Sequence, residues 1–360
     1  MSEFLFPHRL TRRAFLQRSA AAGLGTGLAH GAAAAARAPV KIGSGKFTYT
    51  LDEQWGKLPR GMQYGYGCGV VVDSQDRVYV SSRSTNPCVA IFDKDGKLLE
   101  TWGKAFAAGI GYEDPNKVIS TAYGLYWSKE GDNEYLYWTE NADGPKRGPR
   151  IGARVCKTDL KGKVLYTIGN VGKESATSQR FQFENPTNVA VGPTGDVYVV
   201  DGFGSMLLHR FDKSFKHLKT VGGPGKEHGK FNCCHGIWVS TLRKEPEVYV
   251  ADRSNNRVEV YSPDLAYRRT IADFRLPCSF YQHGGLLYVA EMARRVSVLD
   301  PDDQIVARLG GTEYFKLAEI EQHPDKFGAP QALALSSHGD LYVIEWLHFA
   351  RPRKFKHTPA

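Results

Sequence analysis

The chain has 360 residues, of which 42% are hydrophobic, and its formal net charge is +9. This length exceeds that of an ordinary domain, but large β folds stay single at such lengths, and the apolar fraction is sufficient for a packed core. The basic residues are scattered rather than gathered into a sustained stripe, which excludes an extended nucleic-acid-binding surface. We therefore expect no nucleic-acid partner.

The N-terminal 38 residues have the pattern of a targeting segment. An arginine pair at residues 12–13 stands just ahead of a Phe-Leu step, and a mildly apolar run rich in Ala and Gly covers residues 20–36. This combination is typical of a twin-arginine export signal; the alternative is an amphipathic or disordered arm. We expect residues 1–38 to be removed and residues 39–360 to form the mature domain, which would be periplasmic or secreted.

The rest of the chain carries no further targeting or disulfide signature. No other stretch is apolar over the length needed to span a membrane, so we expect no membrane span after the signal is removed. Six cysteines are present, and export would place them in an oxidising compartment. Their spacing matches no zinc ribbon or haem motif and does not determine a pairing, so buried apolar packing is their ordinary role.

One motif recurs six times along the mature chain, at spacings of 39 to 61 residues between its tyrosines. Each copy has a short central strand built around that tyrosine, preceded by another apolar strand and bounded by Asp, Asn and Gly residues that suit tight turns. A sheet of three or four such short strands cannot bury its own faces, so each copy needs neighbours of its kind. The central strands are RVYVSS (77–82), YLYWTE (135–140), DVYVVD (196–201), EVYVAD (247–252), LLYVAE (286–291) and DLYVIE (340–345).

Six copies of a four-stranded antiparallel sheet predict an all-β fold, a six-bladed β-propeller. The alternating segment GKFTYTL, residues 45–51, stands before the first repeat, and the last repeat offers only one further strand, near residues 350–356. We expect the early strand to complete the last blade and close the ring, because closure removes free sheet edges. We also expect the mature protein to be a monomer.

Five of the six central strands end in an acid, which has two interpretations. The acids could form a collar that binds a cation or an amine. They could instead accept hydrogen bonds from turn N–H groups and brace the neighbouring strand, and their recurrence in nearly every blade favours this structural role. The residues are Glu140, Asp201, Asp252, Glu291 and Glu345.

The inner rim of the ring is the first candidate for a ligand site. In a propeller the first strand of each blade lines the central channel, so the residues just before these strands face one another. A ring of mixed polar residues at a channel mouth suits a ligand. The rim positions hold Cys68, Tyr123, Thr187, His235, Cys278 and Gln331.

The repeats resemble NHL repeats, most clearly over residues 186–261, and together with the VYVSSR strand they resemble peptidylglycine amidating lyase. That family consists of propeller enzymes that cleave peptidyl-α-hydroxyglycine. The resemblance extends over the whole ring, from about residue 45 to residue 356. It implies a zinc ion held by three rim histidines, a substrate-binding arginine and a catalytic tyrosine.

This sequence departs from that pattern at three positions. His235, in CHGIWV, matches the second histidine, whereas Tyr123 and Gln331 stand where the first and third would be. Arg83 matches the substrate-binding arginine, and a guanidinium there could bind a carboxylate with two hydrogen bonds or form a salt bridge between blades. Phe203, in DGFGS, stands where the catalytic tyrosine would be.

These departures favour binding over catalysis. A catalytic zinc normally takes three protein ligands, and a phenylalanine cannot act as a base. We therefore expect a small-molecule, peptide or protein ligand at the channel face. The channel candidates are Arg83, Tyr123, Phe203, His235 and Gln331.

Two alternatives stay open. The first is a metal-dependent lyase or hydrolase with a rebuilt site for a divalent metal such as zinc, copper or calcium. A thiolate and imidazole site made from Cys68, Cys234, His235 and Cys278 would suit copper or zinc. Adjacent Cys234 and His235 would project to opposite sides of a strand, which counts against a site that uses both. The second is a scaffold for an exported multi-protein complex.

Overall fold

The computed structural model describes residues 38–112, 121–141, 153–169, 178–179, 181–311 and 315–359. Apart from its last residue, the expected export signal lies outside the described residues. Within the described part of the chain, no helix has the length and apolar character required to cross a membrane.

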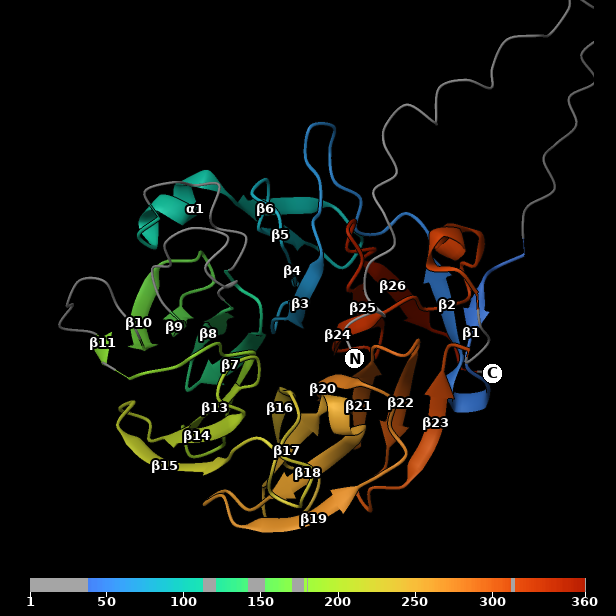
Figure 1. The fold of residues 1–360 in the computed structure, drawn as a ribbon. Coiled ribbons are helices and arrows are strands. Elements are labelled where there is room, and N and C mark those ends of the chain that lie inside the picture. Colours follow the sequence, from blue (N-terminus) through green and yellow to red (C-terminus); the bar gives the residue numbers. More distant parts are fainter. Residues whose placement is uncertain are drawn as a thin grey trace, which may run out of the picture. The chain divides into compact units, whose positions relative to one another are not determined.

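Six sheets surround a common centre in the unit that begins at Pro39, and the prediction of an all-β, six-bladed propeller is confirmed (Figure 1). The strand pairs are antiparallel except for one short parallel pair at the outer edge of the second sheet. In five of the sheets the strands follow chain order from the centre outward, and in the sixth the first two strands of the chain lie outside the last three. Blade 1 holds β3 (Gly67–Val72), β4 (Val78–Ser82), β5 (Val89–Phe92) and β6 (Leu98–Trp102); blade 2 holds β7 (Leu125–Glu130), β8 (Asn133–Glu140), β9 (Arg154–Thr158), β10 (Val164–Gly169) and β11 (Ser178–Gln179); blade 3 holds β12 (Asn188–Val191), β13 (Val197–Asp201), β14 (Leu207–Phe211) and β15 (His217–Gly222).

The second half of the ring continues this arrangement, with outer strands such as β19 and β23 at the periphery of the view (Figure 1). Blade 4 holds β16 (Cys234–Ser240), β17 (Glu247–Asp252), β18 (Arg257–Tyr261) and β19 (Tyr267–Ile271); blade 5 holds β20 (Pro277–His283), β21 (Leu286–Glu291), β22 (Arg295–Leu299) and β23 (Ile305–Leu309); blade 6 holds β24 (Pro330–Leu335), β25 (Leu341–Glu345), β26 (Arg353–His357), β2 (Tyr49–Asp52) and β1 (Lys41–Ile42). Short helices are α1 (Lys104–Gly109) and the 3₁₀ turns Gly45–Phe47, Arg253–Asn255 and Leu317–Gln322.

The hydrophobic core lies between the blades rather than inside any one of them. Each of six buried clusters of described residues draws mainly on two successive blades. One of them joins the last blade to the first, because Tyr342 and Ile344 of β25 pack with Val78 and Val80 of β4. Stacked repeats gain their stability from such neighbour interfaces, so the ring depends on every blade having a partner on both sides.

The last blade is built from both ends of the unit that begins at Pro39. Strand β2 pairs antiparallel with β26, with Tyr49 opposite His357 and Leu51 opposite Phe355. The strand begins later than expected, because Gly45–Phe47 form a 3₁₀ turn and the extended segment starts at Tyr49. The buried Tyr49 hydroxyl lies 3.2 Å from that of Tyr288 in blade 5, so β2 contributes to the contact between blades as well as to its own sheet.

The acids that end the central strands are buried structural acceptors. Asp201 accepts backbone N–H bonds from Glu184 and Asn185, at 2.7 and 2.6 Å. The other four each form a salt bridge with an arginine, and this pattern agrees with the bracing role rather than with an open collar for a cation. The pairs are Glu140 with Arg154, Asp252 with Arg257, Glu291 with Arg295, and Glu345 with Arg351.

Candidate functional site

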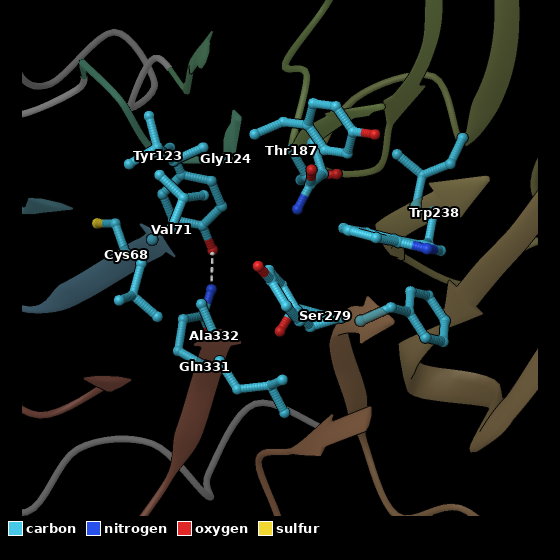
Figure 2. A pocket seen from close by; sticks show the side chains of 18 of the residues that line it. Cys68, Val71, Tyr123, Gly124, Thr187, Trp238, Ser279, Gln331 and Ala332 are labelled. Carbon is cyan, nitrogen blue, oxygen red and sulfur yellow. Dashed lines mark hydrogen bonds between the residues drawn. The ribbon is translucent and has the colours of Figure 1, made fainter. Parts of the chain in front are cut away.

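A cavity of about 200 Å³ occupies the centre of the ring (Figure 2). Five of the six expected rim residues line it: Cys68, Tyr123, Thr187, His235 and Gln331. The sixth, Cys278, is buried outside the lining, and its thiol donates to the Leu276 carbonyl over 3.4 Å. All six cysteines of the chain are buried and unbridged.

Local irregularities in the inner strands place these side chains at the hub. His235 in β16 and Gln331 in β24 each fall where the strand register shifts by one residue, between Cys234 and Gly236 and between Pro330 and Ala332. Such bulges re-aim one side chain while pairing resumes on either side. In these two blades the irregularity thus frees the rim residue to point toward the channel.

Three side chains from three blades meet there, and we call Tyr123, His235 and Gln331 the hub triad. The Nδ1–H of His235 donates to the Cys278 carbonyl over 2.9 Å, which leaves Nε2 as an acceptor. The Tyr123 hydroxyl lies 3.0 Å from this Nε2, and Gln331 Nε2 lies 3.1 Å from it. Gln331 also donates to the Tyr123 oxygen over 3.0 Å, a bond drawn in Figure 2. The hub triad is therefore a closed hydrogen-bonded cluster.

The hub triad is uncharged at neutral pH. Burial, with a smaller effect from the positive charge of Arg253, lowers the pKa of His235 to about 3. Burial likewise raises the pKa of the Tyr123 phenol well above its ordinary value. The imidazole and the phenol therefore act as neutral hydrogen-bonding groups, and neither supplies a charge to the channel.

The zinc that the amidating-lyase resemblance implies does not fit these donors. Zinc prefers thiolate, imidazole and carboxylate ligands, whereas the hub triad offers one imidazole, a protonated phenol and an amide. Burial also raises the pKa of the Cys278 thiol to about 12. In the described ranges no group of three His, Cys, Asp or Glu side chains could hold a metal ion. The role of His235 as a metal ligand stays a prediction, without support from its neighbours.

Four further side chains cover the hub triad, and we call Arg83, Phe203, Arg253 and Trp346 the arginine mouth. Phe203 packs against both Tyr123 and His235, with ring centroids 5.7 and 5.6 Å apart. The Arg83 guanidinium carbon lies 5.1 Å from the Tyr123 ring centroid and 5.5 Å from that of Trp346, and its Nη2 donates to Asn141 Oδ1. All five expected site residues therefore lie in one contiguous cluster.

Arg253 completes the arginine mouth from the 3₁₀ turn after β17. Its guanidinium carbon lies 5.2 Å from the centroid of Phe203, and its side chain hydrogen-bonds to that of Cys278. Among the described residues, no ion pair reaches Arg253; the neighbouring carboxylate of Asp252 pairs with Arg257 instead. A half-buried cation without a carboxylate partner is a candidate anion site.

The sequence contained a signal for Arg253 that residue-by-residue matching missed. Arg253 follows EVYVAD just as Arg83 follows RVYVSS, so the two arginines occupy equivalent positions in blades 4 and 1. Trp346 follows DLYVIE in the same way in blade 6. Superimposing the repeats would have placed all three residues on one face of the ring.

No family model matches the chain. It is 29% identical over 222 residues to the human NHL repeat-containing protein 3 and 31% identical over 222 residues to its mouse counterpart, covering 61% and 60% of this chain. It is also 26% identical over 185 residues, half of this chain, to a probable peptidyl-alpha-hydroxyglycine alpha-amidating lyase of Caenorhabditis elegans. The chain spans only 58%, 57% and 45% of the lengths of these curated relatives.

Solved structures of the same fold share little sequence with the chain. A streptogramin B lyase matches with a TM-score of 0.53 at 11% identity, over 86% of this chain and 98% of that one. A gluconolactonase from Xanthomonas campestris, XC5397, matches with a TM-score of 0.56 at 13% identity, over 88% and 92%. These similarities concern the fold. The structure defines the class as a six-bladed β-propeller, and the chain is similar in sequence to NHL repeat-containing proteins and to a probable amidating lyase.

Proposed function

We propose that the protein is an exported propeller that binds a ligand bearing a carboxylate, such as the end of a peptide, at the arginine mouth. The observation that carries this proposal is Arg253, a half-buried guanidinium without a carboxylate partner among the described residues. Burial makes such a charge costly unless an anion compensates it. A carboxylate matches the planar fork of a guanidinium with two hydrogen bonds.

The surroundings of Arg253 favour a ligand with an apolar or peptide portion next to its carboxylate. Phe203 and Trp346 provide ring surface beside the two arginines, and the second guanidinium, that of Arg83, lies over the Tyr123 ring, which Phe203 also contacts. One relative is named for action on peptidyl-α-hydroxyglycine, a peptide that ends in a carboxylate. This shared chemistry supports a carboxylate-terminated peptide as the ligand class.

Turnover of that ligand is the alternative, which the same relative favours. Cleavage of a hydroxyglycine requires a base close to the reacting hydroxyl. Phe203, at the arginine mouth, cannot accept a proton. The hub triad beneath it is neutral, and its polar groups are hydrogen-bonded to one another. We therefore propose binding without turnover. Stoichiometric zinc, copper or calcium in the purified mature protein would favour the lyase instead.

Calorimetric titration with two matched probes tests the binding proposal. N-acetylglycylglycine carries the carboxylate, and its C-terminal amide lacks only that charge. We expect the acid to bind at least about tenfold more tightly than the amide, and Arg253→Gln to weaken binding of the acid by about tenfold, because a charge-assisted pair is lost.

Arg308→Gln serves as the matched control, since Arg308 lies exposed on the outer strand β23 and pairs with Asp273. This variant should bind the acid as the unsubstituted protein does. Equal affinity for acid and amide, or undiminished binding by Arg253→Gln, would contradict the proposal.

A further inference from the structure

The hub triad divides the channel into two compartments. Tyr123, His235 and Gln331 line the central cavity, whereas none of the four residues of the arginine mouth does. Those four residues lie against the hub triad through ring and cation–π contacts. The cavity is therefore a space of its own, separated from the proposed carboxylate site by three bonded side chains.

The lining of this cavity becomes more exposed with distance from the hub triad. The hub triad is buried, but four aromatic lining residues farther along the inner strands are half-exposed. Three of the four rings follow one another, with centroids 5.4 Å apart between Tyr126 and Trp238 and again between Trp238 and Tyr281. We call this set the aromatic sleeve; it consists of Tyr126, Trp127, Trp238 and Tyr281.

The lining combines aromatic and aliphatic side chains and is uncharged. None of the described residues around the cavity is an Asp, Glu, Lys or Arg. An ion that entered would lose its hydration without meeting an opposite charge, which is costly. Aromatic faces with a few polar groups instead suit a neutral ring. The cavity volume of about 200 Å³ exceeds the ~150 Å³ that is enough for a benzene ring, so one ring with a small substituent fits.

Three polar atoms of the lining residues lack hydrogen-bond partners. They are the side-chain oxygen of Gln331, the hydroxyl of Ser279 and the indole N–H of Trp238, and all three are buried. The amide orientation of Gln331 is set by its two donated bonds to Tyr123 and His235, so Oε1 is left as an acceptor. Buried polar groups are rarely left unpaired in folded proteins. A ligand with an N–H or O–H group would satisfy the oxygen of Gln331.

We propose that the cavity is a second binding site, for a neutral one-ring molecule that carries an amide or hydroxyl group and enters through the aromatic sleeve. Its ring packs against the aromatic sleeve, and its polar substituent reaches Ser279 and Gln331. The site does not depend on the carboxylate site, because different residues on the other side of the hub triad form that one.

Benzamide and toluene are suitable probes, because they share a ring and differ in the polar group. In titrations of the full mature protein followed by ligand-observed NMR, we expect benzamide to bind at least about tenfold more tightly than toluene, since only benzamide can satisfy the unpaired polar atoms. Ser279→Ala removes one hydroxyl at almost unchanged volume. It should weaken benzamide binding about threefold to tenfold and leave toluene binding unchanged.

Ala332→Leu tests the location of the site, since Ala332 lines the cavity and a larger side chain would fill part of it. It should abolish benzamide binding while leaving binding of N-acetylglycylglycine intact. Ala307→Leu on the outer strand β23 adds the same atoms away from the cavity and should leave both unchanged. If Ala332→Leu fails to fold, the comparison of benzamide with toluene and the Ser279→Ala variant still test whether the cavity binds the ligand.

Several results would overturn the proposal. If toluene bound as tightly as benzamide, the unpaired polar atoms would play no part in binding. If tetramethylammonium bound more tightly than either probe, the cavity would be a site for a cation on the aromatic faces rather than for a neutral ring. Full benzamide affinity in Ala332→Leu, or no binding of benzamide to the unsubstituted protein, would show that the cavity is not the site.

Discussion

Replacing Gly236 with alanine is expected to destabilise the propeller by about 3 kcal/mol, which is the upper end of the usual cost of overpacking. Gly236 lies in the inner strand β16, against the start of the next blade. A Cβ atom there would meet the backbone of blade 5, 2.9 Å from the carbonyl carbon of Cys278 and 3.0 Å from Cα of Ser279. Neither atom can move away easily, because the Cys278 carbonyl also accepts the His235 hydrogen bond.

The same close approach recurs in the second blade. A Cβ on Gly124 would lie 2.7 Å from Cα of Asn188 in the inner strand of blade 3. The glycine of the repeat thus sets the spacing between neighbouring inner strands. Gly124→Ala should lower the free energy of unfolding by about as much as Gly236→Ala. Each substitution is measured in its own variant.

Urea unfolding of each variant gives the measurement, with the change in midpoint read at constant slope. Gly109→Ala is the matched control, because a Cβ there meets nothing within 4 Å and the residue is exposed at the end of α1. We expect it to change stability by less than about 1 kcal/mol. A loss equally small in Gly236→Ala would mean that the inner strands can separate without cost.

The fold could be predicted because the sequence pattern that specifies each blade is local and occurs six times along the chain. Each central strand reads as an alternating strand around its tyrosine, and six such copies leave few other architectures. Residues such as Tyr198 and Tyr249 are fully buried, since their sheets are covered by neighbouring blades on both faces. The start of β2 was misplaced by a few residues, because the tight turn at Gly45–Phe47 and an extended strand are both compatible with GKFTYTL.

The site could be predicted only in part, since its contacts join residues of different blades. Rim positions followed from the repeat, and five of the six line the cavity. Repeat spacing does not reveal the bulge that turns His235 inward, nor that Tyr123 and Gln331 would bond to the same imidazole. Arg253 was not predicted as a site residue, because its equivalence with Arg83 is visible in the repeats but the sequence does not show that both guanidinium groups lie near Tyr123.

Lowering the pH from 7 to 5 is expected to destabilise the protein, and His235 should account for roughly 2 kcal/mol of that loss. The folded-state pKa of His235 is about 3, whereas an unfolded histidine has a pKa of about 6.5. At a pH between these two pKa values, the unfolded chain binds a proton at His235 that the folded chain does not bind. The contribution of His235 to the free energy of unfolding is therefore fully present above about pH 6.5, and it declines as the pH falls toward 3.

Three variants separate His235 from other titrating groups. Between pH 7 and pH 5, the free energy of unfolding of His235→Gln should fall by about 2 kcal/mol less than that of the unsubstituted protein, because glutamine binds no proton. Tyr123→Phe keeps the imidazole and removes a hub triad partner that stays neutral, so it should retain the full pH dependence. His209→Gln should reduce the slope separately, since burial lowers the pKa of His209 to about 4. An unchanged slope in His235→Gln, measured by urea unfolding at each pH, would show that the hub admits a proton in the folded state and that the hub triad is not held neutral.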